Sequence, residues 1–187
     1  MKATVWRMTV PGVLLALLVG WYVWPEPEEP TMPVEQAQHR IEAELADVAG
    51  AFHPGLQWAE ARYESDPDLT GLCGTSGCKK TGRAEMIAKQ AARVRITSER
   101  DQEPLDIVRA LWTAKGYSVD RNKGSVEVRG SDFTLWFVVG VNGCAEVRAT
   151  RTNVTDISDD NWHGGFGQGP LDYAAQCATV DDPYWSH

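Results

Sequence analysis

The sequence predicts an α+β fold, in which a C-terminal meander forms an antiparallel sheet, helices pack on one face, and one N-terminal transmembrane helix precedes the domain. Apolar residues recur three and four apart in residues 33–52 and 104–115, as in amphipathic helices. Runs with period two fill residues 117–152, and a segment near the N-terminus has no charge. The chain has 187 residues, of which 43% are hydrophobic and 24% charged, a composition typical of globular proteins.

The uncharged segment covers residues 8–24 (MTVPGVLLALLVGWYVW). As a helix it would rise about 26 Å, which is near the lower limit for crossing a bilayer. The preceding tail, residues 1–7, carries only Lys2 and Arg7, whereas glutamates follow the segment. This asymmetry predicts a single-pass anchor with a cytoplasmic N-terminus. The alternative is a signal peptide that is cleaved to release a secreted protein, but the following WYVWPEPEEP lacks the small residues of a cleavage site, so we favour an uncleaved anchor.

Residues 25–33 (PEPEEPTMP) predict an extended, solvated spacer, because they contain four prolines and three glutamates. An extracytoplasmic domain then covers residues 34–187. Its four cysteines allow three pairings, and proximity favours Cys73–Cys78 and Cys144–Cys177. A zinc site fits less well, because the second pair is far apart and no histidine stands at ligand spacing.

The first helix, residues 33–52, has a buried stripe that we expect to comprise Val34, Ala37, Ile41, Leu45, Val48 and Phe52. A strand is predicted over residues 57–64, after a His-Pro-Gly break. Residues 84–91 (AEMIAKQA) are interpreted as a short helical turn, and residues 92–99 as a half-buried strand.

The second helix begins near Pro104, and Gly116 is expected to cap its C-terminus. Its predicted buried stripe consists of Leu105, Val108, Leu111 and Trp112. Four β-prone runs follow, separated by hairpin turn signals: 117–119, 125–129, 132–141 and 144–152. The third run is the expected centre of the sheet, with Phe133, Leu135, Phe137, Val139 and Val141 on one face. Asn142-Gly143 predicts a two-residue turn into the fourth run.

Charge and motifs exclude several functions. A net charge of −8 and a pI near 5.0 argue against binding to nucleic acid. The glycines of residues 164–169 lack the Gly-Lys-Ser/Thr of a phosphate loop, and Cys73 and Cys78 lack the C-x-x-C spacing of thiol oxidoreductases. No catalytic motif stands out, and we expect no cofactor.

Candidate functional residues gather near the C-terminus. Asp156, Asp159 and Asp160 are weak candidates for a calcium site, because their spacing departs from that of an EF-hand. His163 lies beside aromatic and acidic residues, and is the best single candidate for a functional side chain.

Aromatic residues in the same region suggest a binding surface. Trp162 and Trp185 lie in irregular, polar segments, where burial is not assured. Packing over the edge of the sheet explains these tryptophans equally well.

A resemblance rests on packing and disulfide positions. The second helix ends in L-W-x-x-x-G-Y-x-V (Leu111, Trp112, Gly116, Tyr117, Val119), and an apolar hairpin, a Gly-Cys strand and a late partner cysteine follow. Over roughly residues 90–177 this resembles small actinobacterial secreted or membrane-anchored proteins of unknown function. The resemblance implies no catalytic residue.

The sequence therefore predicts a membrane-anchored extracytoplasmic domain, held in the membrane by residues 8–24, that binds an envelope protein without catalysis. Two alternatives remain. One is an envelope hydrolase with its site near His163, Asp159 and Asp160, and the other is a sensor of metal or pH.

Overall fold

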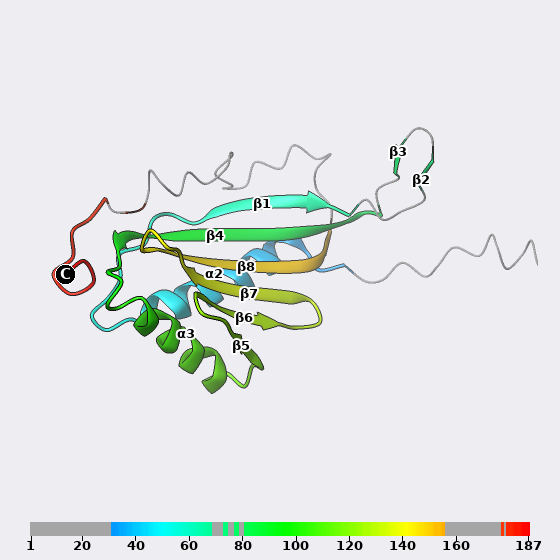
Figure 1. Ribbon diagram of the computed structural model, residues 1–187. Coiled ribbons are helices and arrows are strands. Elements are labelled where there is room, and N and C mark those ends of the chain that lie inside the picture. The colour runs from blue at the N-terminus through cyan, green and yellow to red at the C-terminus, as the bar shows by residue number, and fades with distance from the viewer. Residues whose placement is uncertain (1–30, 69–72, 75–76, 79–80, 156–176, 178) are drawn as a thin grey trace, which may run out of the picture. The chain divides into compact units, whose positions relative to one another are not determined.

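The sheet and helices of this protein are seen in a computed structural model that describes residues 31–68, 73–74, 77–78, 81–155, 177 and 179–187. Six strands form one antiparallel sheet in the order β1-β4-β8-β7-β6-β5 (Figure 1). The elements are α2 (Val34–Gly50), β1 (Arg62–Pro67), β4 (Arg83–Arg95), α3 (Gln102–Ala114), β5 (Val119–Arg121), β6 (Ser125–Arg129), β7 (Phe133–Val139) and β8 (Cys144–Thr155), with a separate hairpin of β2 (Cys73–Gly74) and β3 (Gly77–Cys78). The predicted α+β fold is confirmed for this part of the chain.

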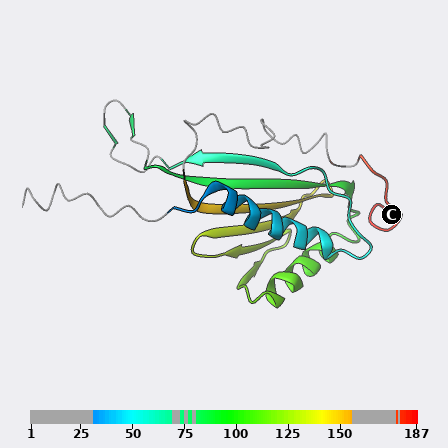
Figure 2. The same ribbon diagram turned by 180° about the vertical axis from the view of Figure 1, so that it is seen from behind.

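Both helices pack on the same face of the sheet, as predicted (Figure 2). All six residues of the stripe predicted in the first helical segment are buried. Of the second stripe, Leu105, Val108 and Trp112 are completely buried, while Leu111 is only partly covered. The helices and the inner face of the sheet therefore share one hydrophobic core.

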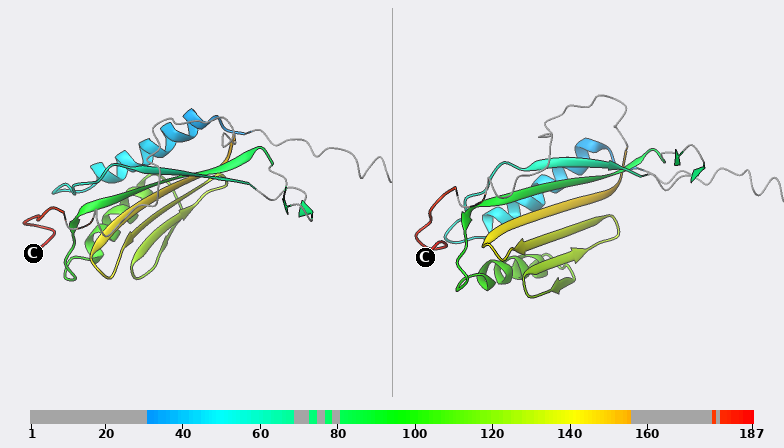
Figure 3. Two further views of the ribbon diagram at one scale, coloured as in Figure 1. Left: turned by 90° about the horizontal axis from the view of Figure 1, so that it is seen from above. Right: turned by 45° about the horizontal axis from the view of Figure 1, so that its top comes forward.

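The inner face of the sheet follows directly from the pairing register. Leu135 of β7 lies opposite Ala149 of β8, and Phe137 lies opposite Val147, so that buried residues meet buried residues. β7 and β8 are the two central strands, and the sheet twists along its length (Figure 3). Val141 departs from the predicted inner face, because β7 ends at Val139 and leaves the valine in the following turn.

Residues 84–91 do not form the predicted helical turn. They belong to β4, a strand of 13 residues that pairs with β1 on one side and β8 on the other. Ala, Glu, Met, Lys and Gln favour a helix locally, but Ala84, Met86 and Ala88 are buried at every second position. The pairing with both neighbours outweighs the local preference.

The first strand lies later in the chain than predicted. β1 begins at Arg62, and Trp58 forms only an isolated bridge with Ala92. The backbone between them is still tied to β4, because the Ala59 amide donates to the carbonyl of Ala91. The domain also begins before residue 34, since the Met32 amide donates to the Asn153 carbonyl at 2.7 Å.

A polar cluster joins α2 to the end of α3. Lys115 donates to the carboxylates of Glu44 (2.7 Å) and Asp47 (2.6 Å), and the Tyr117 hydroxyl donates to Glu44 at 2.8 Å. Burial raises the pKa of Tyr117, and the hydrogen bond to Glu44 adds to the rise. Burial alone would lower the pKa of Lys115, but its bonds to the two carboxylates outweigh that effect and raise it. Gly116 allows the turn between these residues with φ +84°, as the predicted cap requires.

Candidate binding site at the disulfide-linked end of the sheet

A cavity of about 640 Å³ opens at the end of the sheet where β4 leads toward α3. This volume lies within the range of small-ligand sites. Four segments form its walls: the end of β4, the connection to α3, the turn between β7 and β8, and the C-terminal tail. The lining residues that matter below are Arg95, Thr97, Glu99, Val141, Asp181 and Ser186.

The turn between β7 and β8 differs from the predicted two-residue turn. The Gly143 amide donates to the Gly140 carbonyl at 2.8 Å, and the Gly140 amide donates to the carbonyl of Cys144 at 2.9 Å. Gly143 alone takes a positive φ, +78°, where an I′ turn needs two such residues. A Cβ at this position would also collide with the carbonyl oxygen of Ile96. The backbone of the turn thus packs directly against the end of β4.

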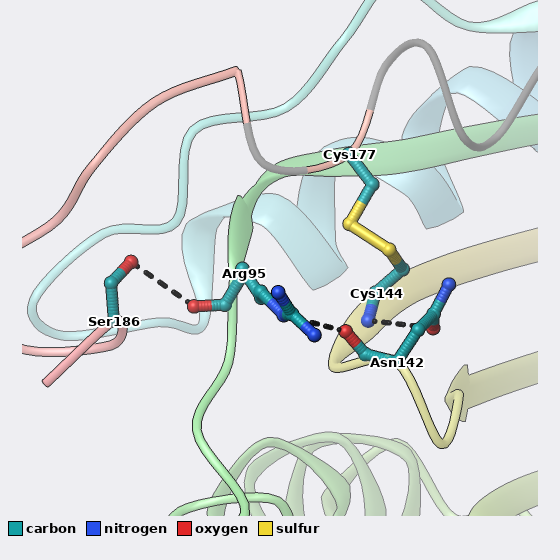
Figure 4. The surroundings of a disulfide bond; sticks show 5 residues. All are labelled: Arg95, Asn142, Cys144, Cys177 and Ser186. Carbon is teal, nitrogen blue, oxygen red and sulfur yellow. Dashed lines mark hydrogen bonds between the residues drawn. A yellow bond between two sulfur atoms is a disulfide. The ribbon is translucent and has the colours of Figure 1, made fainter.

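The predicted Cys144–Cys177 disulfide is present, with Cα atoms 5.7 Å apart (Figure 4). It ties the C-terminal tail to the first residue of β8, beside the cavity. In the chain-entropy model, a bridge across 33 residues contributes about 3.7 kcal/mol to stability. A structural disulfide of this kind points to an oxidising, extracytoplasmic compartment.

Trp185 is a core residue, which corrects its prediction as an exposed binding residue. Its exposed fraction is 0%, and its indole N–H donates to the carbonyl of Pro54 at 3.2 Å. The ring packs edge-on against Phe52 with centroids 5.9 Å apart. Polar neighbours in the sequence concealed this burial, because the side chain of Asp182 accepts the amide hydrogens of Tyr184 and Trp185 and turns the tail inward.

The tail continues from this anchor along the cavity wall. The Ser186 hydroxyl donates to the carbonyl of Arg95 at 3.0 Å, and His187 lies 3.1 Å from the Asp181 carboxylate. Val180 forms a parallel bridge with Val94. The wall is therefore held by β4, the core and the disulfide together.

One cation and several carboxylates line the cavity. The Arg95 Nε donates to the carbonyl of Asn142 at 2.9 Å, which fixes the direction of the guanidinium (Figure 4). Within the described residues, its two Nη atoms have no hydrogen-bond or ion-pair partner, and neither does the carboxylate of Glu99. The hydroxyl of Thr97 is buried in the wall without a partner. Burying a hydroxyl without a hydrogen-bond partner lowers the stability of a fold by about 1–3 kcal/mol.

Val141 stands at the rim of the cavity. It is fully exposed, and no other large hydrophobic residue of the described part of the chain is exposed in this way. A turn favours polar residues or glycine. Its apolar side chain therefore stands beside the arginine and the carboxylates of the cavity lining.

The other predicted site residues have different outcomes. The binding candidates Trp162 and His163 and the metal candidates Asp156, Asp159 and Asp160 lie outside the described residues, so these roles stay predictions. The backbones of Cys73 and Cys78 pair with each other in the register of β2 and β3, and the bridge between the two residues stays a prediction. In the residues that the structure describes, no cluster of three potential metal ligands occurs.

The predicted anchor, residues 8–24, also lies outside the described part of the chain. Among the helices that are described, none has both the length and the apolar character to cross a bilayer.

Comparison with known proteins gives no relative. No family model, no curated protein and no solved structure matches the chain. The resemblance to small actinobacterial envelope proteins stays a prediction.

The sequence contained only a partial signal for the cavity. Asn142-Gly143 before Cys144 marked a tight turn beside a bridge, but nothing in the local pattern distinguished Arg95 or Glu99 from other surface charges.

Proposed function

We propose that this protein is a membrane-anchored, extracytoplasmic binding module without catalytic activity, and that it captures a protein of the cell envelope. In this proposal residues 8–24 cross the membrane with the N-terminus in the cytoplasm, and residues 25–33 hold the domain away from the bilayer. The cavity beside the Cys144–Cys177 disulfide is the contact site.

One observation carries the proposal: a preformed cavity, lined by both charged and apolar groups, has a fully exposed apolar side chain, Val141, on its rim. Interfaces combine an apolar anchor with surrounding polar groups that set specificity. The cavity walls come from distant segments joined by a disulfide and a buried tryptophan, so little ordering remains to oppose binding.

Site-specific crosslinking in the native membrane tests this contact. A photoreactive phenylalanine analogue replaces Val141 in the full chain, and the same analogue replaces Ser131 as the control. Ser131 is exposed in the hairpin between β6 and β7, at the other end of β7. We expect one discrete adduct from position 141, none from position 131, and loss of the adduct when Arg95→Glu is added.

Three results would overturn the proposed function, capture of an envelope protein at this cavity: no adduct from position 141, equal adducts from both positions, or an adduct that Arg95→Glu leaves unchanged. His163→Ala addresses the hydrolase alternative. It should leave the adduct intact if the protein is a binding module, and an envelope activity that disappears in this variant would favour the enzyme.

The membrane anchor requires its own measurement. A non-reducing peptide map of the protein recovered from the membrane fraction should retain residues 8–24 and show both disulfides. A mature N-terminus within or after residues 25–33 would establish a cleaved signal peptide and a secreted protein instead.

A further inference from the structure

The charges of the cavity are not paired with one another. The guanidinium of Arg95 and the carboxylate of Glu99 line the same cavity, yet no ion pair within 4.0 Å joins them in the described structure. Opposite charges on flexible surface side chains gain little by pairing in water, so the absence of a pair is ordinary by itself. What distinguishes this site is that one of the two charges is held in place.

Arg95 is held by one hydrogen bond from its side chain and by another to its backbone. Its Nε donates to the carbonyl of Asn142, and its own carbonyl accepts the hydroxyl of Ser186 (Figure 4). The guanidinium therefore keeps two Nη donors available in a fixed direction. A planar fork of this kind matches the two oxygens of a carboxylate.

The other charged groups of the lining favour a cation. Glu99, Asp101 and Asp181 all contribute to the lining, and the protein as a whole is acidic. A ligand with only negative charge would meet these carboxylates, and one with only positive charge would meet Arg95. A group that carries both charges complements the arginine and the carboxylates together.

The size of the cavity limits the length of the segment that it can hold. A volume of about 640 Å³ corresponds to a cube about 9 Å on a side. In an extended peptide, side chains two residues apart point the same way and are separated by about 7 Å. The residue between them points away from the cavity, and Val141 on the rim can contact the apolar part of the segment.

We infer that the cavity binds an extended segment of the partner protein that carries an acidic and a basic side chain two residues apart. The acidic side chain pairs with Arg95, and the basic side chain pairs with Glu99. The unpartnered hydroxyl of Thr97 lies in the same wall and is a further polar group that the fold itself leaves unsatisfied. This inference rests on the proposed function, because it names the chemistry of the partner at the same site.

Capped tripeptides, which have no charged termini, test the inference. The probes are acetyl-Asp-Ala-Lys-amide and acetyl-Lys-Ala-Asp-amide, added to the full chain in detergent micelles and followed by ¹⁵N NMR. We expect one order of residues to shift the amides of Ser98, Val141 and Gly143, with a Kd of roughly millimolar strength. Replacing the Asp of that probe by Asn, or its Lys by Gln, should weaken binding about three- to fivefold.

Variants of the protein should show the same dependence. Arg95→Gln and Glu99→Gln should each weaken binding of the dipolar probe about three- to fivefold. Arg93→Gln and Glu60→Gln are the matched controls, because both residues are exposed and neither lines the cavity. Unchanged amide spectra away from the cavity would show that each variant is folded.

Opposite results would overturn the inference: equal binding of single-charge probes, shifts outside the cavity, or no shift at all. The crosslinking experiment separates this failure from that of the proposed function. An adduct at position 141 without binding of either tripeptide would refute only the ligand chemistry, whereas tripeptide binding without an adduct would refute only the envelope-protein partner.

Discussion

Trp185 is expected to be a main determinant of stability, although only two residues follow it in the sequence. Its side chain is completely buried against Phe52 and Tyr184, and its indole donates to the Pro54 carbonyl. Removing a buried tryptophan costs about 3–5 kcal/mol, and losing the hydrogen bond costs about 1 kcal/mol more. Trp185→Ala should therefore lower the free energy of unfolding by about 4–6 kcal/mol.

Urea unfolding followed by far-UV circular dichroism, with the disulfides intact, measures this loss. For a domain of this size the corresponding fall in Tm is about 8–24 °C. Trp185→Phe is the matched variant. It keeps an aromatic ring in the core but loses the indole donor, so its cost should be about 1–2 kcal/mol.

A loss below about 1 kcal/mol for Trp185→Ala would refute the reasoning, because truncating a fully buried side chain of this size destabilises a protein by more than that. It would mean that the tail does not complete the core, and the wall that Asp181 and Ser186 give the cavity would no longer be supported.

Two further predictions concern the backbone and the ionisable groups. Gly143→Ala should destabilise the fold by more than about 2 kcal/mol in urea unfolding, because φ is positive at this position and the new Cβ meets a backbone carbonyl. The control Gly50→Ala, at an open helix end, should be neutral or stabilising. Equal effects of the two substitutions would contradict this account. The pKa values of Lys115 and Tyr117 are raised in the folded state. The stabilisation that their protonated side chains give the fold is therefore fully present below their unfolded pKa values, near 10, and is lost as the pH rises through their folded pKa values. The free energy of unfolding should therefore fall as the pH rises above about 10, and Tyr117→Phe should make that fall shallower. An unchanged slope would exclude the tyrosine as a contributor.

Local periodicity explains why the sequence predicted most of the core. In α2, Ile41, Leu45 and Val48 are buried because their spacing places them on one side of a helix. In β7, Leu135 and Phe137 are buried because alternate residues share a face of the strand. These assignments depend only on residues close together in the chain.

The misassigned segments depend on partners far away in the chain. Residues 84–91 have helical propensity, and they become part of β4 only because β1 and β8 pair with them on both sides. Trp185 lies among polar residues, and its burial follows from Phe52 and Pro54, more than 130 residues earlier. No local pattern contains that information.

By itself, the sequence determined the α+β class, the two helical stripes, the C-terminal meander and the cysteine pair 144–177, because each is expressed in local spacing or in simple proximity. Only the tertiary structure decided the cavity, since Arg95, Glu99, Val141 and Asp181 come from four segments that meet at one end of the sheet. Burial and electrostatic surroundings are properties of neighbours in space. They arise when the long-range contacts of the fold form, and the order of residues along the chain does not specify them locally.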